Sequence, residues 1–133
     1  MKVRKDYTCP LEIVHDILKG KWKTIILYQM KDGKKSLSEL QREIVGISQK
    51  MLLEQLGELI QFGLVEKKKY EGYPLRVEYS LTKRRGEYII EALKIMQKVG
   101  VDYMLENGMD QELLCKGILN EKEIDEIKNR HRK

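Results

Sequence analysis

Residues 36–63, SLSELQREIVGISQKMLLEQLGELIQFG, contain two helical patterns separated by a tight turn. Ser38 is placed to cap a first short helix, because Gln41 can reach back to it. The pattern then breaks, and Ser48 offers the N-cap of a second helix that ends at Gly63. Apolar residues recur along this second helix at Met51, Leu52, Leu56, Leu59 and Ile60. The segment therefore predicts two helices joined by a tight turn.

Two more helices are expected upstream of this pair. The first begins at Pro10, a residue favoured in the first turn, and ends at Gly20. The second runs from Trp22 to Met30, before a glycine that signals a helix C-terminus.

A β-hairpin is expected downstream of Gly63, because the apolar pattern changes there from helical to alternating. Residues 64–70 form one strand, and Gly72 and Pro74 belong to the turn that follows. In the second strand Leu75, Val77, Tyr79 and Leu81 face one way, and Arg76, Glu78 and Ser80 face the other.

Thr82 caps a long helix with an apolar stripe of about 16 residues. One small core does not need so long a stripe, so part of it is expected to face another subunit. We assign residues 9–107 to one domain that includes this dimerisation helix. Residues 108–133 form a helical extension of unassigned role.

This order of elements is that of a winged helix-turn-helix, a mainly α fold with a small β-hairpin. In that fold the second helix of the pair enters the major groove of DNA, and the hairpin lies along the backbone.

The composition is that of one globular domain of 133 residues, with 41% hydrophobic and 35% charged residues. No apolar run is long enough to cross a bilayer, so we expect a cytoplasmic protein without membrane contact. The net charge is +5, and residues 19–35 and 64–86 carry local excesses of +5 and +4. Two basic segments are typical of a protein that binds a polyanion. From charge alone, the alternative is that these lysines only keep exposed faces solvated.

The candidate DNA-reading residues lie where the second helix begins. Ser48, Gln49 and Lys50 occupy its N-terminus, where glutamine can pair with adenine and lysine with guanine or phosphate. Free N–H groups at a helix N-terminus also hold phosphate. Three further outward positions are Leu53, Glu54 and Gly57. The hairpin is expected to add backbone contacts through Lys67, Lys68, Lys69 and Arg76.

Six blocks of residues resemble the HxlR-type winged helix-turn-helix regulators, which are relatives of the MarR group. The most specific are Gly20-Lys-Trp22, Gly46-Ile-Ser-Gln-Lys-Met-Leu52 and Arg76-Val-Glu-Tyr-Ser-Leu-Thr82, and the resemblance spans residues 9 to about 105. It implies a homodimeric transcription factor, with the dimer built on the N- and C-terminal helices and a recognition helix that spans about Ser48 to Phe62. It also places Arg76 on the wing.

The sequence departs from that family pattern at several positions. Leu53 replaces a polar residue, Gly57 an arginine and Leu75 a proline, so the predicted reading surface is thinner than usual. Arg85 stands where a glycine is expected, and Gly86 follows it.

Two cysteines, Cys9 and Cys115, are expected as thiols. Cys9 lies at a helix N-terminus with Arg4 and Lys5 upstream, an environment that favours a reactive thiolate. Some members of the resembled family sense electrophiles or oxidants through an N-terminal cysteine. The redox hypothesis is that Cys9, with or without Cys115 of the other subunit, alters the dimer. The alternative is a small buried cysteine with no sensing role.

The function expected from the sequence is a transcriptional regulator, with repression as the expected mode, that binds a pseudo-palindromic operator in double-stranded DNA as a homodimer. Its small-molecule effector is open. The alternative is a winged-helix module that binds a partner protein without an operator. No metal-ligand spacing, phosphate loop or nucleophile motif occurs, so no cofactor, metal or enzymatic activity is expected.

Overall fold

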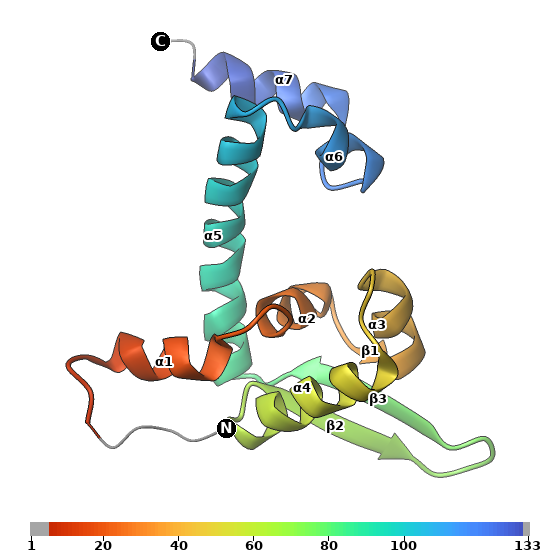
Figure 1. Ribbon diagram of the computed structural model, residues 1–133. Coiled ribbons are helices and arrows are strands. Elements are labelled where there is room, and N and C mark those ends of the chain that lie inside the picture. The colour runs from red at the N-terminus through yellow and green to blue at the C-terminus, as the bar shows by residue number, and fades with distance from the viewer. Residues whose placement is uncertain (1–5, 132–133) are drawn as a thin grey trace. The chain divides into compact units, whose positions relative to one another are not determined.

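The computed structural model describes residues 6–131, which form seven helices and three strands (Figure 1). Contacts divide the chain into two compact units, one ending at Leu93 and the other beginning at Lys94. The elements of the first unit are α1 (Pro10–Leu18), α2 (Lys23–Gln29), β1 (Lys35–Ser36), α3 (Leu37–Glu43), α4 (Gln49–Gln61), β2 (Val65–Tyr70) and β3 (Arg76–Leu81). Helix α5 (Arg85–Glu106) crosses the division, and α6 (Asp110–Cys115) and α7 (Glu121–Arg130) follow it. The predicted fold class, mainly α with a small β-hairpin, is confirmed, and a short third strand pairs with the hairpin.

Helices α3 and α4 are the predicted pair. The N-cap of α4 was predicted correctly, and that of α3 was not. Ser48 caps α4 as expected, because its hydroxyl oxygen accepts a hydrogen bond from the Met51 backbone N–H at 3.1 Å. The predicted cap of α3 at Ser38 is wrong. Ser36 is the cap, and it exchanges hydrogen bonds with Glu39 in a capping box.

The sheet has three strands in the order β1-β3-β2, all antiparallel. The two-residue strand β1 was not predicted, and its pairing with β3 fixes the start of α3 one residue later. We call the β2–β3 hairpin the wing, and in Figure 1 its turn projects past the helices. Tyr79 faces the core as predicted, whereas Leu75 is exposed because it precedes the strand and lies in the projecting turn.

The core of the first unit lies between α2, α3, α4 and the sheet. Its fully buried centre comprises Ile26, Leu27, Leu40, Leu52, Leu56 and Leu59. The buried residues of α4 are three of the five predicted for its stripe, and the other two pack against the core from its margin. Within residues 6–131, one charged residue is also buried. The Lys23 ammonium group of α2 forms an ion pair with Glu58 of α4.

The start of α5 packs closely against the strands. Helix α5 begins at Arg85, so Thr82 lies before the N-cap position instead of at it as predicted, but its hydroxyl oxygen still accepts from the Gly86 N–H of the first turn at 2.8 Å. The Thr82 O–H donates to the Gly63 carbonyl at 2.7 Å. Arg85 donates to the Phe62 carbonyl at the end of α4, which gives the displaced arginine a structural role. Gly86 lies so close to Leu64 that a side chain has no room there.

The second unit has a small core of its own, formed by Leu105, Leu113 and Ile124 from α5, α6 and α7. Asn120 and Glu123 form the predicted capping box of α7. The helical character expected for the tail is therefore confirmed. Across residues 6–131, every helix is too short or too polar to traverse a bilayer.

Candidate nucleic-acid interface

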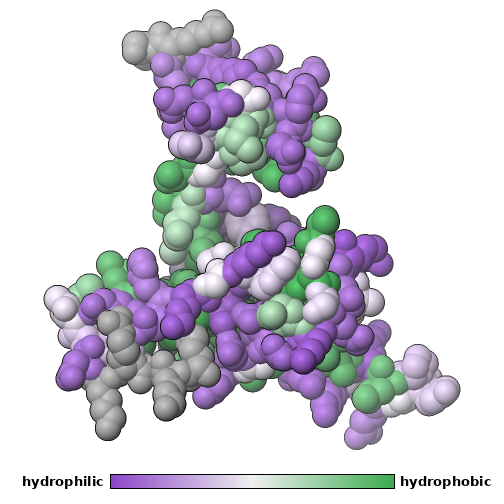
Figure 2. Space-filling model, in the orientation of Figure 1, coloured by the Kyte–Doolittle hydropathy of each residue, from purple (hydrophilic) through white to green (hydrophobic). Residues whose placement is uncertain are grey.

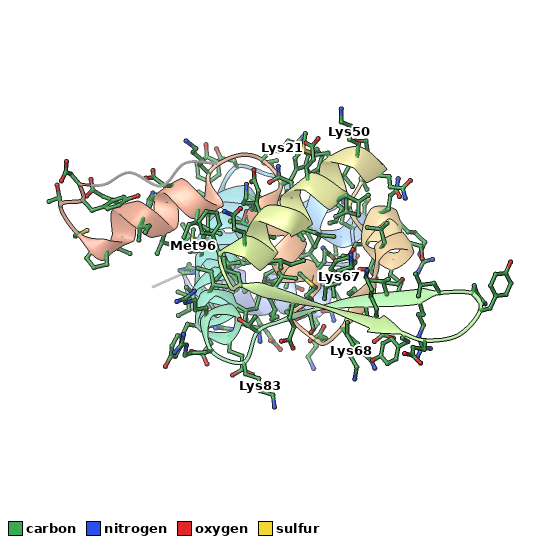
Figure 3. The ribbon with its side chains drawn as sticks, turned by 90° about the horizontal axis from the view of Figure 1, so that it is seen from below. Lys21, Lys50, Lys67, Lys68, Lys83 and Met96 are labelled. Atoms are coloured by element: carbon green, nitrogen blue, oxygen red, sulfur yellow. The ribbon has the colours of Figure 1, made fainter. Side chains whose placement is uncertain are left out.

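The N-terminal turn of α4 is open to solvent. Ser48, Gln49 and Lys50 are all exposed, and Figure 3 shows Lys50 pointing away from the molecule at this end of the helix. The Ser48 hydroxyl oxygen accepts from Met51, so its O–H proton remains able to donate to an incoming group. The first backbone N–H groups of a helix add partial positive charge to the same place.

The next turn of α4 continues this exposed face. Leu53 is 44% exposed, and Glu54 and Gly57 are exposed beside it. A Cβ added at Gly57 would meet nothing within 4 Å, so no neighbour explains the glycine at this position. The outward residues predicted for α4 thus share one exposed surface, while the buried residues on the opposite face pack the helix against α2 and β2.

The three lysines of the wing do not share one face. In the strand register Lys67 lies opposite Tyr79, whereas Lys68 lies opposite Glu78. Because successive residues of a strand alternate between faces, Lys67 and Lys69 share the face of the buried tyrosine, and Lys68 lies on the outer face. Figure 3 shows Lys67 and Lys68 on opposite sides of β2.

Arg76 lies at the start of β3, and it is not isolated. Its Nε atom is 3.5 Å from Glu78 Oε1, and its guanidinium group lies over the Tyr70 ring at 4.5 Å from the centroid. Glu78 also accepts a hydrogen bond from the Tyr70 hydroxyl at 3.2 Å. Lys34, which precedes β1, completes the group with its Nζ atom 3.2 Å from Glu78 Oε2.

The charges in this group stabilise one another. Burial acts to raise the pKa of Glu78, but hydrogen bonds from Lys34 and Tyr70 and the charges of Lys34 and Arg76 lower it below its ordinary value. The hydrogen bond to Glu78, followed by the charge of that carboxylate, raises the pKa of Lys34. Both groups therefore stay ionised at neutral pH.

Lys34, Tyr70 and Glu78 were missed as site residues in the sequence. The signal for two of them was present, because a hairpin with a four- to five-residue turn places Tyr70 opposite Arg76 and Glu78 one step farther along the same face. Lys34 could not be placed without β1, which brings it beside β3.

The two cysteines lie in different units. Cys9 is the exposed N-cap of α1, and its backbone N–H donates to the Glu12 carboxylate at 3.1 Å. Arg4 and Lys5, expected to favour its thiolate, lie outside the described residues. Cys115 is the last residue of α6 and is also exposed. Cys9 is therefore not buried by residues 6–131 of its own chain.

Part of the α5 stripe is not covered by residues 6–131. Leu93 is buried, but Met96, Val99 and Tyr103 are exposed, with Ile95 beside them. Figure 2 shows apolar surface along this helix. An exposed apolar surface of this kind is typical of a protein–protein contact.

Comparisons with known proteins agree on one class. The family model described as HxlR-like helix-turn-helix matches residues 17–108. The HTH-type transcriptional regulator YkvN of Bacillus subtilis (strain 168) is 45% identical over 78 residues, which are 59% of this chain and 66% of YkvN. The matched part thus spans just under two thirds of that relative.

Solved structures give the same result over most of their own length. A MarR-family transcriptional regulator from Porphyromonas gingivalis W83 is 38% identical, with a TM-score of 0.68 over 75% of this chain and 97% of that one. The redox regulator HypR in its oxidized form is 39% identical, with a TM-score of 0.66 over 71% of this chain and 96% of that one.

Proposed function

The chain belongs to the HxlR-like helix-turn-helix family and is a transcriptional regulator of that type, and from this premise we propose that it binds a pseudo-palindromic operator as a homodimeric repressor. The observation that carries the proposal is the exposed N-terminal turn of α4, held on a rigid core and accompanied by the basic wing. A helix presented in this way fits the major groove.

Each residue of the surface has a proposed role in this reading. Gln49 pairs with adenine and Lys50 with guanine or phosphate, while Ser48 and the helix N-terminus hold a phosphate. Leu53 offers an apolar contact for a thymine methyl group, and Glu54 an acceptor for the cytosine amino group. Lys67, Lys68, Lys69 and Arg76 supply affinity that does not depend on sequence.

Because α4 is proposed to supply specificity and the wing to supply affinity that does not depend on sequence, alanine variants of the two elements are expected to affect DNA binding differently. Gln49→Ala is expected to cost about 1 to 3 kcal/mol of binding free energy on the cognate site and almost nothing on other DNA. Lys68→Ala is expected to weaken all duplexes alike and to lower the salt slope by about one unit. Binding to DNA from upstream of the protein's own gene and to a scrambled duplex, each at two salt concentrations, measures both effects.

Exposed residues of the second unit provide matched controls for this experiment. Gln111→Ala and Lys122→Ala change the same residue types on α6 and α7 and are expected to leave both affinities unchanged. Equal losses on cognate and scrambled DNA for Gln49→Ala would contradict the assignment of specificity to α4.

We further propose that Cys9 senses oxidants or electrophiles. Its thiol is exposed, and the similarity to the redox regulator HypR supports the idea. Oxidation would form a disulfide between Cys9 and a second thiol. That thiol belongs either to Cys115 of the other subunit or to a small molecule. The oxidant diamide would accept the two electrons and two protons.

The redox proposal predicts that Cys9→Ser binds operator DNA normally when reduced but no longer responds to diamide or methylglyoxal. Cys115→Ser identifies the disulfide partner of Cys9, since this variant abolishes the response only if Cys115 is that partner. DNA binding before and after treatment measures the response. A Cys9→Ser protein that responds as the wild type does would rule out sensing by this residue.

The second candidate function, a module that binds a partner protein, is favoured by the exposed apolar residues of α5. It predicts weak binding to every duplex, with little dependence on salt. The salt series described above therefore distinguishes the two functions.

A further inference from the structure

The outer face of the wing gathers several cations around one aromatic ring. Tyr70, the last residue of β2, lies opposite Arg76, the first residue of β3. The guanidinium carbon of Arg76 is 4.5 Å from the ring centroid, and the Nζ atoms of Lys68 and Lys34 are 5.0 Å and 5.8 Å from it. An aromatic face attracts such cations, and a planar guanidinium group laid over it has a restricted orientation.

The Glu78 carboxylate also contacts this guanidinium group, on the side of its Nε atom. Glu78 Oε1 lies 3.5 Å from Arg76 Nε, and Glu78 Oε2 accepts from the Tyr70 hydroxyl. The Glu78 side chain is 14% exposed, whereas that of Arg76 is 64% exposed. Arg76 pairs with Glu78 through its Nε atom, and its terminal Nη groups form no hydrogen bond within residues 6–131.

This arrangement leaves the terminal Nη groups of Arg76 available to bind phosphate. An arginine binds phosphate oxygens through two parallel N–H donors, and its affinity rises when the side chain is already held in the binding geometry. Three cations and one carboxylate also give the group a net charge of +2, which attracts a phosphate.

We propose that Tyr70 and Glu78 are positioning residues that hold Arg76 as a fork for a backbone phosphate of duplex DNA. The inference rests on the proposed DNA-binding function and adds to it two residues with no expected contact to DNA. It differs from a purely electrostatic role for Arg76, in which only the positive charge matters and the ring has no part.

Variants that leave the net charge unchanged separate these two roles. Arg76→Lys keeps the charge but loses the fork, and we expect DNA affinity to fall roughly five- to tenfold. Tyr70→Val removes the ring but keeps a residue favoured in strands, and we expect a loss of roughly three- to fivefold. Tyr70→Phe keeps the ring and is expected to stay within about twofold of the wild type.

The decisive measurement is the coupling between the two positions. Because the ring acts through the guanidinium group, the Tyr70→Val/Arg76→Lys double variant is expected to bind about as well as Arg76→Lys alone. Tyr73→Val is the matched control, because Tyr73 is fully exposed in the turn of the same hairpin. Its effect is expected to multiply with that of Arg76→Lys.

The probe is a duplex of arbitrary sequence at low salt, so the experiment needs no known operator. Thermal unfolding of each variant verifies that the wing is folded. Glu78→Gln combined with Arg76→Lys provides a second double-mutant cycle, which leaves the Tyr70 ring intact. The effect of Glu78→Gln on DNA affinity is expected to differ by about twofold or more between the wild-type and Arg76→Lys backgrounds.

The outcomes separate the inference from the proposed function. Coupling of Tyr70 and Glu78 to Arg76, without coupling of Tyr73, supports the inference. Wild-type binding with independent, multiplicative effects overturns the positioning role and leaves DNA binding intact. A wild-type protein that fails to bind any duplex at low salt overturns both.

Discussion

Gly86→Ala is expected to destabilise the protein by about 3 kcal/mol or more and to lower the melting temperature by roughly 10–15 °C. A Cβ at this position would lie 2.6 Å from the Leu64 carbonyl oxygen and 3.0 Å from the Leu81 backbone. The Leu64 oxygen cannot move away freely, because it accepts a hydrogen bond from the Thr82 N–H at 3.1 Å. The start of α5 would have to separate from the strands.

The same substitution at Gly57 is the control for this prediction. Gly57 also lies within a helix, but its added Cβ would meet no atom within 4 Å. Because alanine is favoured over glycine in a helix, Gly57→Ala is expected to stabilise the protein by about 0.5 to 1 kcal/mol. Thermal unfolding followed by circular dichroism measures both variants. A Gly86→Ala protein that melts within about 2 °C of the wild type would show that the contact can relax.

Glu58→Gln is expected to cost about 3 kcal/mol of unfolding free energy. The Lys23 side chain is 4% exposed and that of Glu58 is 30% exposed, so the substitution leaves a buried ammonium group without its counter-charge. Loss of one partner of a buried pair costs about 3 to 5 kcal/mol, and the partial exposure of Glu58 places this case at the lower end. Urea unfolding measures the loss.

Two further variants test whether the buried charge is the cause. Lys23→Met in the Glu58→Gln background removes the unpaired ammonium group and is expected to restore most of the lost stability. Glu54→Gln, an exposed residue on the same helix, is expected to change the unfolding free energy by less than about 0.5 kcal/mol. Equal stabilities of Glu58→Gln and Glu54→Gln would refute a role for the pair.

The order of helices and strands was predictable from the sequence because it depends on periodicity. The stripe on α4 extends over several helical turns and the alternation of β3 over several residues, and Gly63 marks the end of α4. The exposed residues at the N-terminus of α4 followed directly, since they are the positions that the stripe leaves uncovered.

Features that depend on tertiary contacts were not predictable in the same way. Ser36 and Ser38 both precede a residue able to complete a capping box, and the choice between them depends on β1, whose two residues carry no pattern. A lysine at position 23 also looks like a surface residue until α4 places Glu58 beside it. The Arg76 group required the register of a hairpin together with Lys34 from a distant part of the chain.

The position of β2 in the sheet has a consequence for solubility. Within the part of the chain that the structure describes, β2 pairs only with β3, so its other side is an unpaired strand edge. Such an edge can template strand pairing between molecules and lead to aggregation, and lysines on it oppose that pairing. Lys67, Lys68 and Lys69 are therefore expected to oppose such pairing by charge repulsion, in addition to their proposed role on DNA. A protein with all three lysines neutralised is expected to aggregate, whatever nucleic acid is present.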